Sequence, residues 1–222
     1  MRVGIKSYVK QTDFPDVVPV FPLSSALLLP GGQMPLNIFE PRYMAMVDEA
    51  MAGSRLIGMV QPSFAEKNEL REKPELCEVG CLGRITHFAE VDDGRYHITL
   101  TGVSRFRIEE ELPVNTAFRQ CKILPFLSDL EPEKGAEKVD RQQLLKAFKS
   151  YLDANGMDAD WDSVGRANTA ILVNALSMMS PYGPAEKQAL LEAPDLKTRA
   201  DTLIAITEIS LARNGESGSN LQ

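Results

Sequence analysis

The chain has 222 residues, of which 44% are hydrophobic and 25% are charged, and its formal net charge is -7. These values are typical of a globular protein with one large domain or two small ones, and the acidic balance does not favour binding to nucleic acid. Residues 1–10 are not expected to form a secretory signal, and the sequence has no apolar run of about 18 residues and only three cysteines. We therefore expect a cytoplasmic protein that has neither a membrane span nor a disulfide framework.

The N-terminal half is predicted to consist mainly of short strands. After an N-terminal arm (1–16), β-rich runs are expected at 17–21, 27–29, 34–38, 56–61, 79–89, 96–101, 104–110 and 118–125. Asp92-Asp93-Gly94 predicts a hairpin turn, and Pro41 predicts the start of one inserted helix that ends at Gly53. Residues 61–74 show neither the period of two of a strand nor the period of 3.6 of a helix, and they are predicted to form a mobile loop. Many short strands with one helix favour a closed or half-closed barrel over 17–127.

The C-terminal half is predicted to be helical, which makes the fold class α+β. A linker (128–135) leads into a helical part (136–214), followed by a disordered tail (215–222). One apolar stripe runs from Leu144 to Leu152 and stops at Asn155-Gly156, which is a left-handed helix end. Further helices are expected from the stripe Val164, Ala167, Ile171, Ala175 and Met178, from Pro184, and from the apolar face between Leu196 and Leu211.

Several motifs along the N-terminal half occur in an unusual order. They are VFPL at 20–23, LLPGG at 28–32, PLNIFEPRY at 35–43, IGMV at 57–60, EVGCLGRI at 78–85 and LTGVSRFRI at 100–108. In this order they resemble the N-terminal substrate-binding domain of the Lon protease family, strongly over 17–125 and more loosely over the helical half. The resemblance implies a PUA-like pseudo-barrel followed by a helical bundle, and a role in holding polypeptide substrates for degradation.

The ATPase and peptidase parts of a Lon protease are not expected in this chain. No G-x-x-x-x-G-K-[ST] phosphate-binding loop occurs in the sequence, which stops before either part could begin. The resemblance thus implies a stand-alone, non-enzymatic binding module with no catalytic residue and no cofactor. We expect it to bind unfolded or regulatory polypeptides, to serve as an adaptor for proteolysis, and to meet a Lon-type protease as a further partner.

The candidate peptide-binding residues lie in the turned segment around Pro35 and Pro41. Alternation cannot bury both Leu36 and Phe39 on one face, so part of this apolar surface is predicted to form a peptide-docking groove. Glu40 and Arg42 are expected to pair at the start of the helix and to border the groove. The complete set of candidates is Met34, Leu36, Phe39, Glu40, Arg42 and Tyr43.

Other functional classes have weaker support in the sequence. His87 and His97 lie in predicted strands without a G-x-S-x-G motif, so a small hydrolase of unrecognised type is only an alternative. Cys77 and Cys81 do not have the spacing of a known zinc site, and we expect structural thiols and no metal. RNA binding is a second alternative if four arginines gather on one face, but nearby glutamates favour cross-strand ion pairs. Those arginines are Arg84, Arg105, Arg107 and Arg119.

Overall fold

The computed structural model describes residues 1–64, 73–92, 94–131 and 135–219. They form two compact units, which are described separately. The first comprises Met1–Pro132 and Tyr182–Leu191, and the second comprises Glu133–Pro181 and Glu192–Gln222. This division differs from the expected one, because the sequence pattern placed the whole of 136–214 in the helical part.

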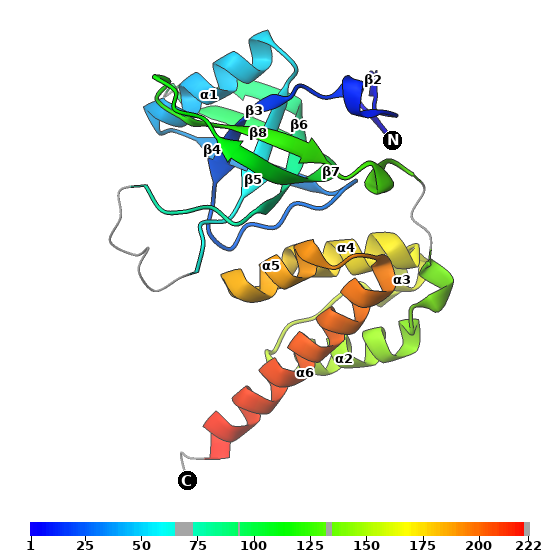
Figure 1. Cartoon of the computed structure of the whole chain (residues 1–222). Helices are drawn as coiled ribbons and strands as arrows, with labels where there is room; N and C mark the ends of the chain where they lie inside the picture. The colour runs from blue at the N-terminus through cyan, green and yellow to red at the C-terminus, as the bar shows by residue number, and fades with distance from the viewer. Residues whose placement is uncertain (65–72, 93, 132–134, 220–222) are drawn as a thin grey trace. The chain divides into compact units, whose positions relative to one another are not determined.

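The first unit is built on a six-stranded sheet that closes on itself (Figure 1). The strand order is β4-β7-β6-β5-β3-β8, and the C-terminal part of β7 also pairs with β8. Strands β3 and β5 pair in parallel, and the other pairings of the described strands in this sheet are antiparallel. The strands are β3 (Val17–Pro22), β4 (Gln33–Ile38), β5 (Leu56–Val60), β6 (Val79–Glu90), β7 (Tyr96–Glu111) and β8 (Arg119–Pro125). The α+β class and the closed sheet that the sequence predicted are confirmed.

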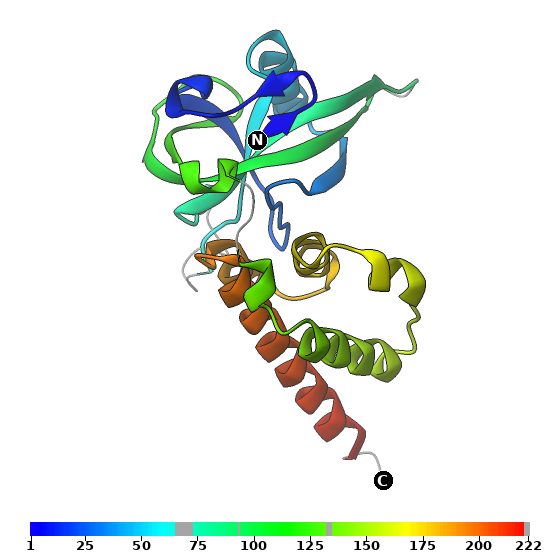
Figure 2. The ribbon, with the colours of Figure 1, turned by 90° about the vertical axis from the view of Figure 1, so that its right-hand side faces the viewer.

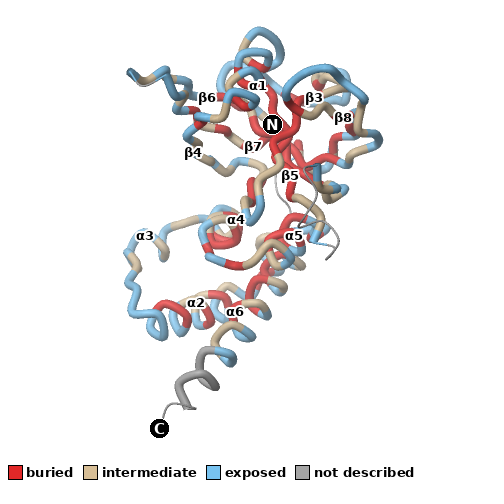
Figure 3. The backbone as a smooth tube through the Cα atoms, turned by 90° about the vertical axis from the view of Figure 1, so that its left-hand side faces the viewer, coloured by how far each residue is buried: buried red, intermediate tan, exposed pale blue. Residues whose placement is uncertain are grey.

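The interior of the closed sheet is filled by apolar side chains from every second strand position. Phe106 and Leu82 are fully buried there, and the buried positions of the strands stand out in Figure 3. The N-terminal residues contribute as well: β1 (Arg2–Val3) and β2 (Lys6–Ser7) form a small hairpin, and Tyr8 and Phe14 join the same core. The expected N-terminal arm is therefore part of the packed unit.

The predicted strand at 27–29 is not a strand, although all three leucines are buried. A Cβ atom added at Gly102 would lie 2.1 Å from the carbonyl oxygen of Leu29, so only glycine permits this approach. The amide nitrogens of Gly31 and Gly102 also donate to the carbonyl oxygens of Gly102 and Gly32 at 2.9 Å each. Since Gly102 is part of β7, the runs expected at 96–101 and 104–110 form one continuous strand.

The inserted helix α1 (Pro41–Ala52) begins at Pro41 and is followed by Gly53, as predicted. Its buried face, Tyr43, Met46, Val47 and Ala50, packs toward the sheet. The predicted turn between β6 and β7 includes Asp93, which lies outside the described residues. Gly94 has a φ of 78°. The two strands of this hairpin extend beyond the rest of the sheet (Figure 2).

The segment at 61–74, predicted to be a mobile loop, starts with a buried side chain. Gln61 is 1% exposed; its amide nitrogen donates to the carbonyl oxygen of Pro184 at 3.0 Å and to Oε1 of Gln188 at 3.1 Å. The central part of the predicted loop, 65–72, lies outside the described residues. The expected linker at 128–135 likewise begins in packed structure, because Leu130 in the short helix η3 (Leu127–Leu130) is buried.

Helix α5 (Pro184–Glu192) belongs to the unit that contains the sheet. The side-chain amide of Gln188 donates to the carbonyl oxygen of Val79 at 3.0 Å, and Arg105 donates to that of Leu191 at 3.1 Å. Leu190 and Leu191 are buried. These long-range contacts explain why the chain returns to the first unit after residue 181.

The second unit is helical. Its main helices are α2 (Arg141–Ala154), α3 (Trp161–Arg166), α4 (Thr169–Met179) and α6 (Leu196–Ser219). Gly156 follows α2 with a φ of 63°, the left-handed end that was predicted. Residues 215–219 belong to α6, where a disordered tail was expected from 215 onward, and 220–222 lie outside the described residues. Among the described helices, none is long and apolar enough to cross a membrane.

The predicted stripe from Val164 to Met178 does not form one buried helix face. Asn168 caps a new helix by accepting a hydrogen bond from the amide of Ala170, and this separates α3 from α4. In α4 the buried residues are Leu172, Val173, Asn174, Leu176 and Ser177. Ile171, which was assigned to the stripe, is 66% exposed.

Candidate functional site

The candidate residues from β4 lie on the apolar face of three neighbouring strands. Met34 pairs with Leu100 of β7, and Leu36 pairs with Ile98. Ile98 also pairs with Phe88 of β6. Because paired residues in neighbouring strands share a face of the sheet, Met34, Leu36 and Phe88 lie on the same side.

The other side of these three strands is polar. Gln33, Pro35 and Asn37 of β4 are exposed, as are His87 of β6 and His97 of β7. Such an alternation of polar and apolar residues is typical of an antiparallel sheet that has one solvent-exposed face. Both histidines therefore lie on the opposite side from Leu36 and Phe88.

The apolar side is incompletely covered. Phe88 is 37% exposed, and its ring meets that of Tyr96 edge-on with centroids 5.0 Å apart. Met34, Leu36 and Tyr96 are half-buried. Burial, together with a hydrogen bond to the carboxylate of Asp48 in α1, raises the pKa of Tyr96. We call the surface formed by Met34, Leu36, Phe88 and Tyr96 the apolar face.

The remaining candidates lie where β4 leads into α1. Phe39 is 63% exposed, a large value for a phenylalanine. Glu40 and Arg42 form the expected ion pair at 2.8 Å, and the Arg42 guanidinium lies 4.5 Å from the ring centroid of Tyr43. The Tyr43 ring packs on Phe21 with centroids 4.2 Å apart.

Tyr43 differs from the other five candidates because it is a core residue that is 9% exposed. Burial raises the pKa of its hydroxyl. The structure thus leaves the other five candidates half-buried or exposed, and the Tyr43 ring supports the Arg42 guanidinium.

Phe88 and Tyr96 were missed by the sequence reasoning. Both lie in correctly predicted strands, but whether they lie close to Leu36 depends on the register between β4, β7 and β6. The signal that could have found them is the hairpin turn at 92–94, which brings Phe88 and Tyr96 close together whatever the position of β4.

The four arginines that could have formed an RNA-binding face do not gather. Arg105 is buried and pairs with Asp129 at 2.8 Å. Arg107 pairs with Glu78, and Arg119 with Glu111, as the expectation of ion pairs suggested. The Arg119 and Lys73 side chains hydrogen-bond to Glu111 and lower the pKa of its carboxyl group against the effect of burial.

The cysteines occupy interior positions. Cys81 and Cys121 are buried, and Cys77 is half-buried with its sulfur 3.7 Å from the carbonyl oxygen of Pro62. Burial is the main cause that raises the pKa of the Cys121 thiol to about 11. Within the described part of the chain, no group of three or more His, Cys, Asp or Glu side chains is placed to hold a metal ion.

Known proteins similar to this chain are Lon proteases. Residues 17–208 match the family model of the ATP-dependent protease La (LON) substrate-binding domain. A Lon protease of Desulfosudis oleivorans is 36% identical over 194 residues, which cover 83% of this chain and 23% of that protein. One from Cytophaga hutchinsonii is 27% identical, with 88% and 24% covered. The chain thus spans about a quarter of the length of these curated relatives.

Two solved structures show the same fold. A Lon N-terminal domain protein from Xanthomonas campestris matches with a TM-score of 0.61 and 21% identity, covering 85% of this chain and 97% of that one. The N-terminal domain of a Mycobacterium avium complex Lon protease matches with a TM-score of 0.63 and 20% identity, covering 86% and 98%. Together with the match of the family model over 17–208, this shows that the chain belongs to the family of LON substrate-binding domains.

Proposed function

We propose that the chain binds unfolded or flexible polypeptide segments on the apolar face and on the neighbouring Phe39. The observation that carries this proposal is the incomplete covering of apolar side chains at one end of an otherwise well-packed sheet. Phe39 is 63% and Phe88 37% exposed, whereas Phe14, Phe21, Phe106 and Phe118 of the same unit are buried. A partly exposed apolar surface that has a polar border is typical of a protein-binding site.

The chemistry of this surface suits a sequence-tolerant partner. Methionine and aromatic side chains adapt to differently shaped apolar groups, while the Glu40–Arg42 pair supplies a charged border. Strand β4 lies at the end of the sheet order, but Pro35 at its centre has no N–H group to donate to an added strand. Binding would therefore rest on side-chain contacts.

We assign to the chain a binding role without catalysis. As part of the same proposal, it acts in the cytoplasm as an adaptor that presents unfolded or regulatory polypeptides to a Lon-type protease. The support is the family description of a substrate-binding domain and the names of the relatives, which are Lon proteases.

Replacing both exposed aromatics should weaken the binding of an unfolded polypeptide. For the Phe39→Ser/Phe88→Ser variant we expect a dissociation constant about tenfold higher or more, since each partly buried phenylalanine contributes on the order of 1 kcal/mol. Fluorescence anisotropy with a labelled, reduced and carboxymethylated model protein that cannot fold would measure it.

The matched control is Leu124→Ser. Leu124 is 40% exposed on β8, away from the apolar face, and its replacement should change the dissociation constant by less than about twofold. Equal losses in the two variants would show that general surface hydrophobicity, and not this face, holds the polypeptide. Unchanged binding in the double variant would refute the assignment of the site.

A further inference from the structure

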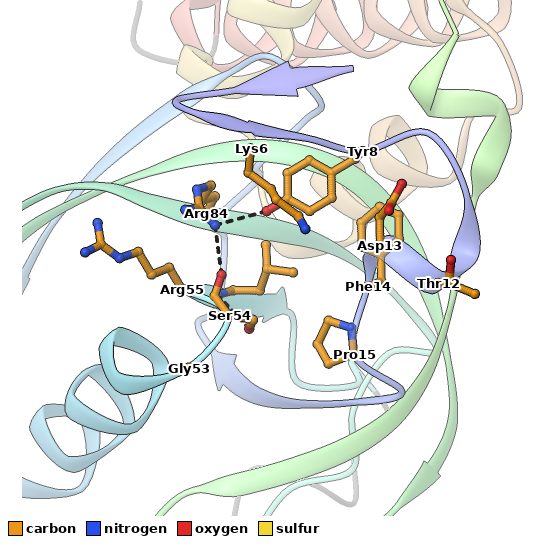
Figure 4. A pocket seen from close by; sticks show the side chains of 11 residues that line it. Lys6, Tyr8, Thr12, Asp13, Phe14, Pro15, Gly53, Ser54, Arg55 and Arg84 are labelled. Carbon is orange, nitrogen blue, oxygen red and sulfur yellow. Dashed lines mark hydrogen bonds between the residues drawn. The ribbon is translucent and has the colours of Figure 1, made fainter.

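A second site lies in a polar pocket of the first unit, apart from the apolar face. It has a volume of about 400 Å³ and lies between the N-terminal hairpin with the residues that follow it and the turn that joins α1 to β5 (Figure 4). This volume falls within the range of small-ligand sites, which is about 300 to 1,000 Å³.

The pocket carries three cationic side chains that come from three separate elements. They are Lys6 of β2, Arg55 of the turn after α1, and Arg84 of β6. Among the described residues, none of the three forms an ion pair with a carboxylate. In a chain with a net charge of -7, this is a local excess of positive charge.

Arg84 is held in place by neutral groups. Its Nη1 donates to the carbonyl oxygen of Ser54 at 2.8 Å and to the hydroxyl oxygen of Tyr8 at 3.2 Å. A guanidinium has five N–H donors, so these two contacts orient it without using all of its donors. Burial raises the pKa of Tyr8 although Arg84 opposes this shift, so the hydroxyl stays neutral beside the guanidinium.

The one acidic group at the pocket is already engaged. The carboxylate of Asp13 accepts hydrogen bonds from the amides of Val9 and Lys10 at 2.8 and 3.0 Å, and these bonds lower its pKa. In Figure 4 it lies on the far side of the Tyr8 ring from Arg55. The three cations and this carboxylate leave the lining with an excess of two positive charges.

The backbone at the pocket is held in an unfavourable conformation. Arg55 has a φ of 61°, which residues other than glycine, asparagine and aspartate rarely adopt. Two hydrogen bonds of 2.8 Å fix it: its amide donates to the carbonyl oxygen of Ala50, and its own carbonyl oxygen accepts from the amide of Ile85. Strained residues of this kind cluster at binding sites.

We propose that this pocket binds the oxyanion group of a small molecule, a carboxylate or a phosphate. Lys6 and the unused donors of Arg84 would contact the oxygens, and Arg55 would add positive charge at the border. The stacked rings of Tyr8 and Phe14, with centroids 5.0 Å apart, give the rest of the ligand an apolar wall. The site is independent of polypeptide binding at the apolar face.

The test uses citrate and inorganic phosphate as separate probes for the two groups. Isothermal titration at low salt and constant ionic strength should give a dissociation constant on the order of 1 mM or lower for one of them, as expected for a few charge-assisted hydrogen bonds. Tighter binding of citrate would identify a carboxylate ligand, and tighter binding of phosphate would identify a phosphoryl ligand.

The variant Lys6→Gln/Arg55→Gly should weaken this binding at least tenfold. Glycine suits a φ of 61°, so the change at Arg55 removes the charge without straining the backbone. Ser25→Gly, at the other non-glycine residue with a φ of 61°, controls for the backbone change, and Arg107→Gln controls for the loss of an exposed arginine elsewhere on the unit. Both controls should bind like the original protein. The proposal would be overturned if neither probe bound at a concentration tenfold above the expected dissociation constant. Unchanged binding in the double variant would also overturn it.

Discussion

Replacing Asp129 with alanine should lower the free energy of unfolding by about 3 to 5 kcal/mol, because it removes a carboxylate that pairs with a buried guanidinium. The Asp129 carboxylate accepts from Nε and Nη2 of Arg105 at 2.9 and 2.8 Å, and from the Arg105 amide at 2.9 Å. The two side chains are only 5% and 9% exposed. Urea unfolding followed by circular dichroism would measure the loss as a lower midpoint with an unchanged slope.

The pair matters because it joins three elements of the first unit. Arg105 lies in β7 and Asp129 in η3, while Nη1 of Arg105 donates to the carbonyl oxygen of Leu191 at the end of α5. A charge removed at Asp129 thus weakens the attachment of two elements to the sheet.

The matched control is Glu78→Ala, which breaks the exposed pair between Arg107 and Glu78, whose side chains are 53% and 77% exposed. It should cost less than about 0.5 kcal/mol. Removing both charges with Arg105→Met/Asp129→Ala should cost less than Asp129→Ala alone. A loss below about 1 kcal/mol in Asp129→Ala would show that the buried pair does not hold η3 and α5 to β7.

The architecture could be predicted wherever local periodicity determines it. Seven of the eight expected strand runs begin or end within two residues of a strand in the structure, because alternation of apolar residues marks them. Leu27–Leu29 fails because three buried leucines without alternation look the same in a strand and in an extended segment. The sequence pattern merged α3 and α4 because Asn168 interrupts the helical backbone while the apolar residues on both sides keep their helical spacing.

Contacts between distant segments could not be predicted. The return of α5 to the sheet depends on hydrogen bonds of Gln188 with Gln61 and Val79, more than 100 residues away. The candidate site shows the same limit: Leu36 and Phe39 follow from local alternation, whereas Phe88 joins them only through the strand register. The cationic pocket combines Lys6, Arg55 and Arg84 from three segments that only the folded chain brings together.

The stability of the protein should rise with pH between about 8 and 10.5 because of Lys187. This α5 side chain is 3% exposed, and burial lowers the pKa of its ammonium group from 10.5 to about 8. Between these two pH values the unfolded chain binds the proton and the folded chain does not, so raising the pH favours the folded state. Below pH 8 both states are protonated, and the folded protein bears the full cost of burying the charge, about 3 kcal/mol.

The variant Lys187→Met should abolish this pH dependence, because methionine has a similar length and no charge. Urea unfolding at pH values from 7 to 9.5 would measure it, and Lys146→Met, at an exposed position of α2, serves as the control that keeps the original dependence. Burial raises the pKa values of Tyr8, Tyr43 and Tyr96, which opposes the lysine effect at the alkaline end, but this contribution cancels between variant and original protein. Between pH 7 and 9.5, the free energy of unfolding of the original protein should therefore rise by about 2 kcal/mol relative to that of Lys187→Met. Parallel curves for the two proteins would mean that Lys187 keeps an ordinary pKa, and that α5 lies over the sheet loosely enough for water to reach its ammonium group.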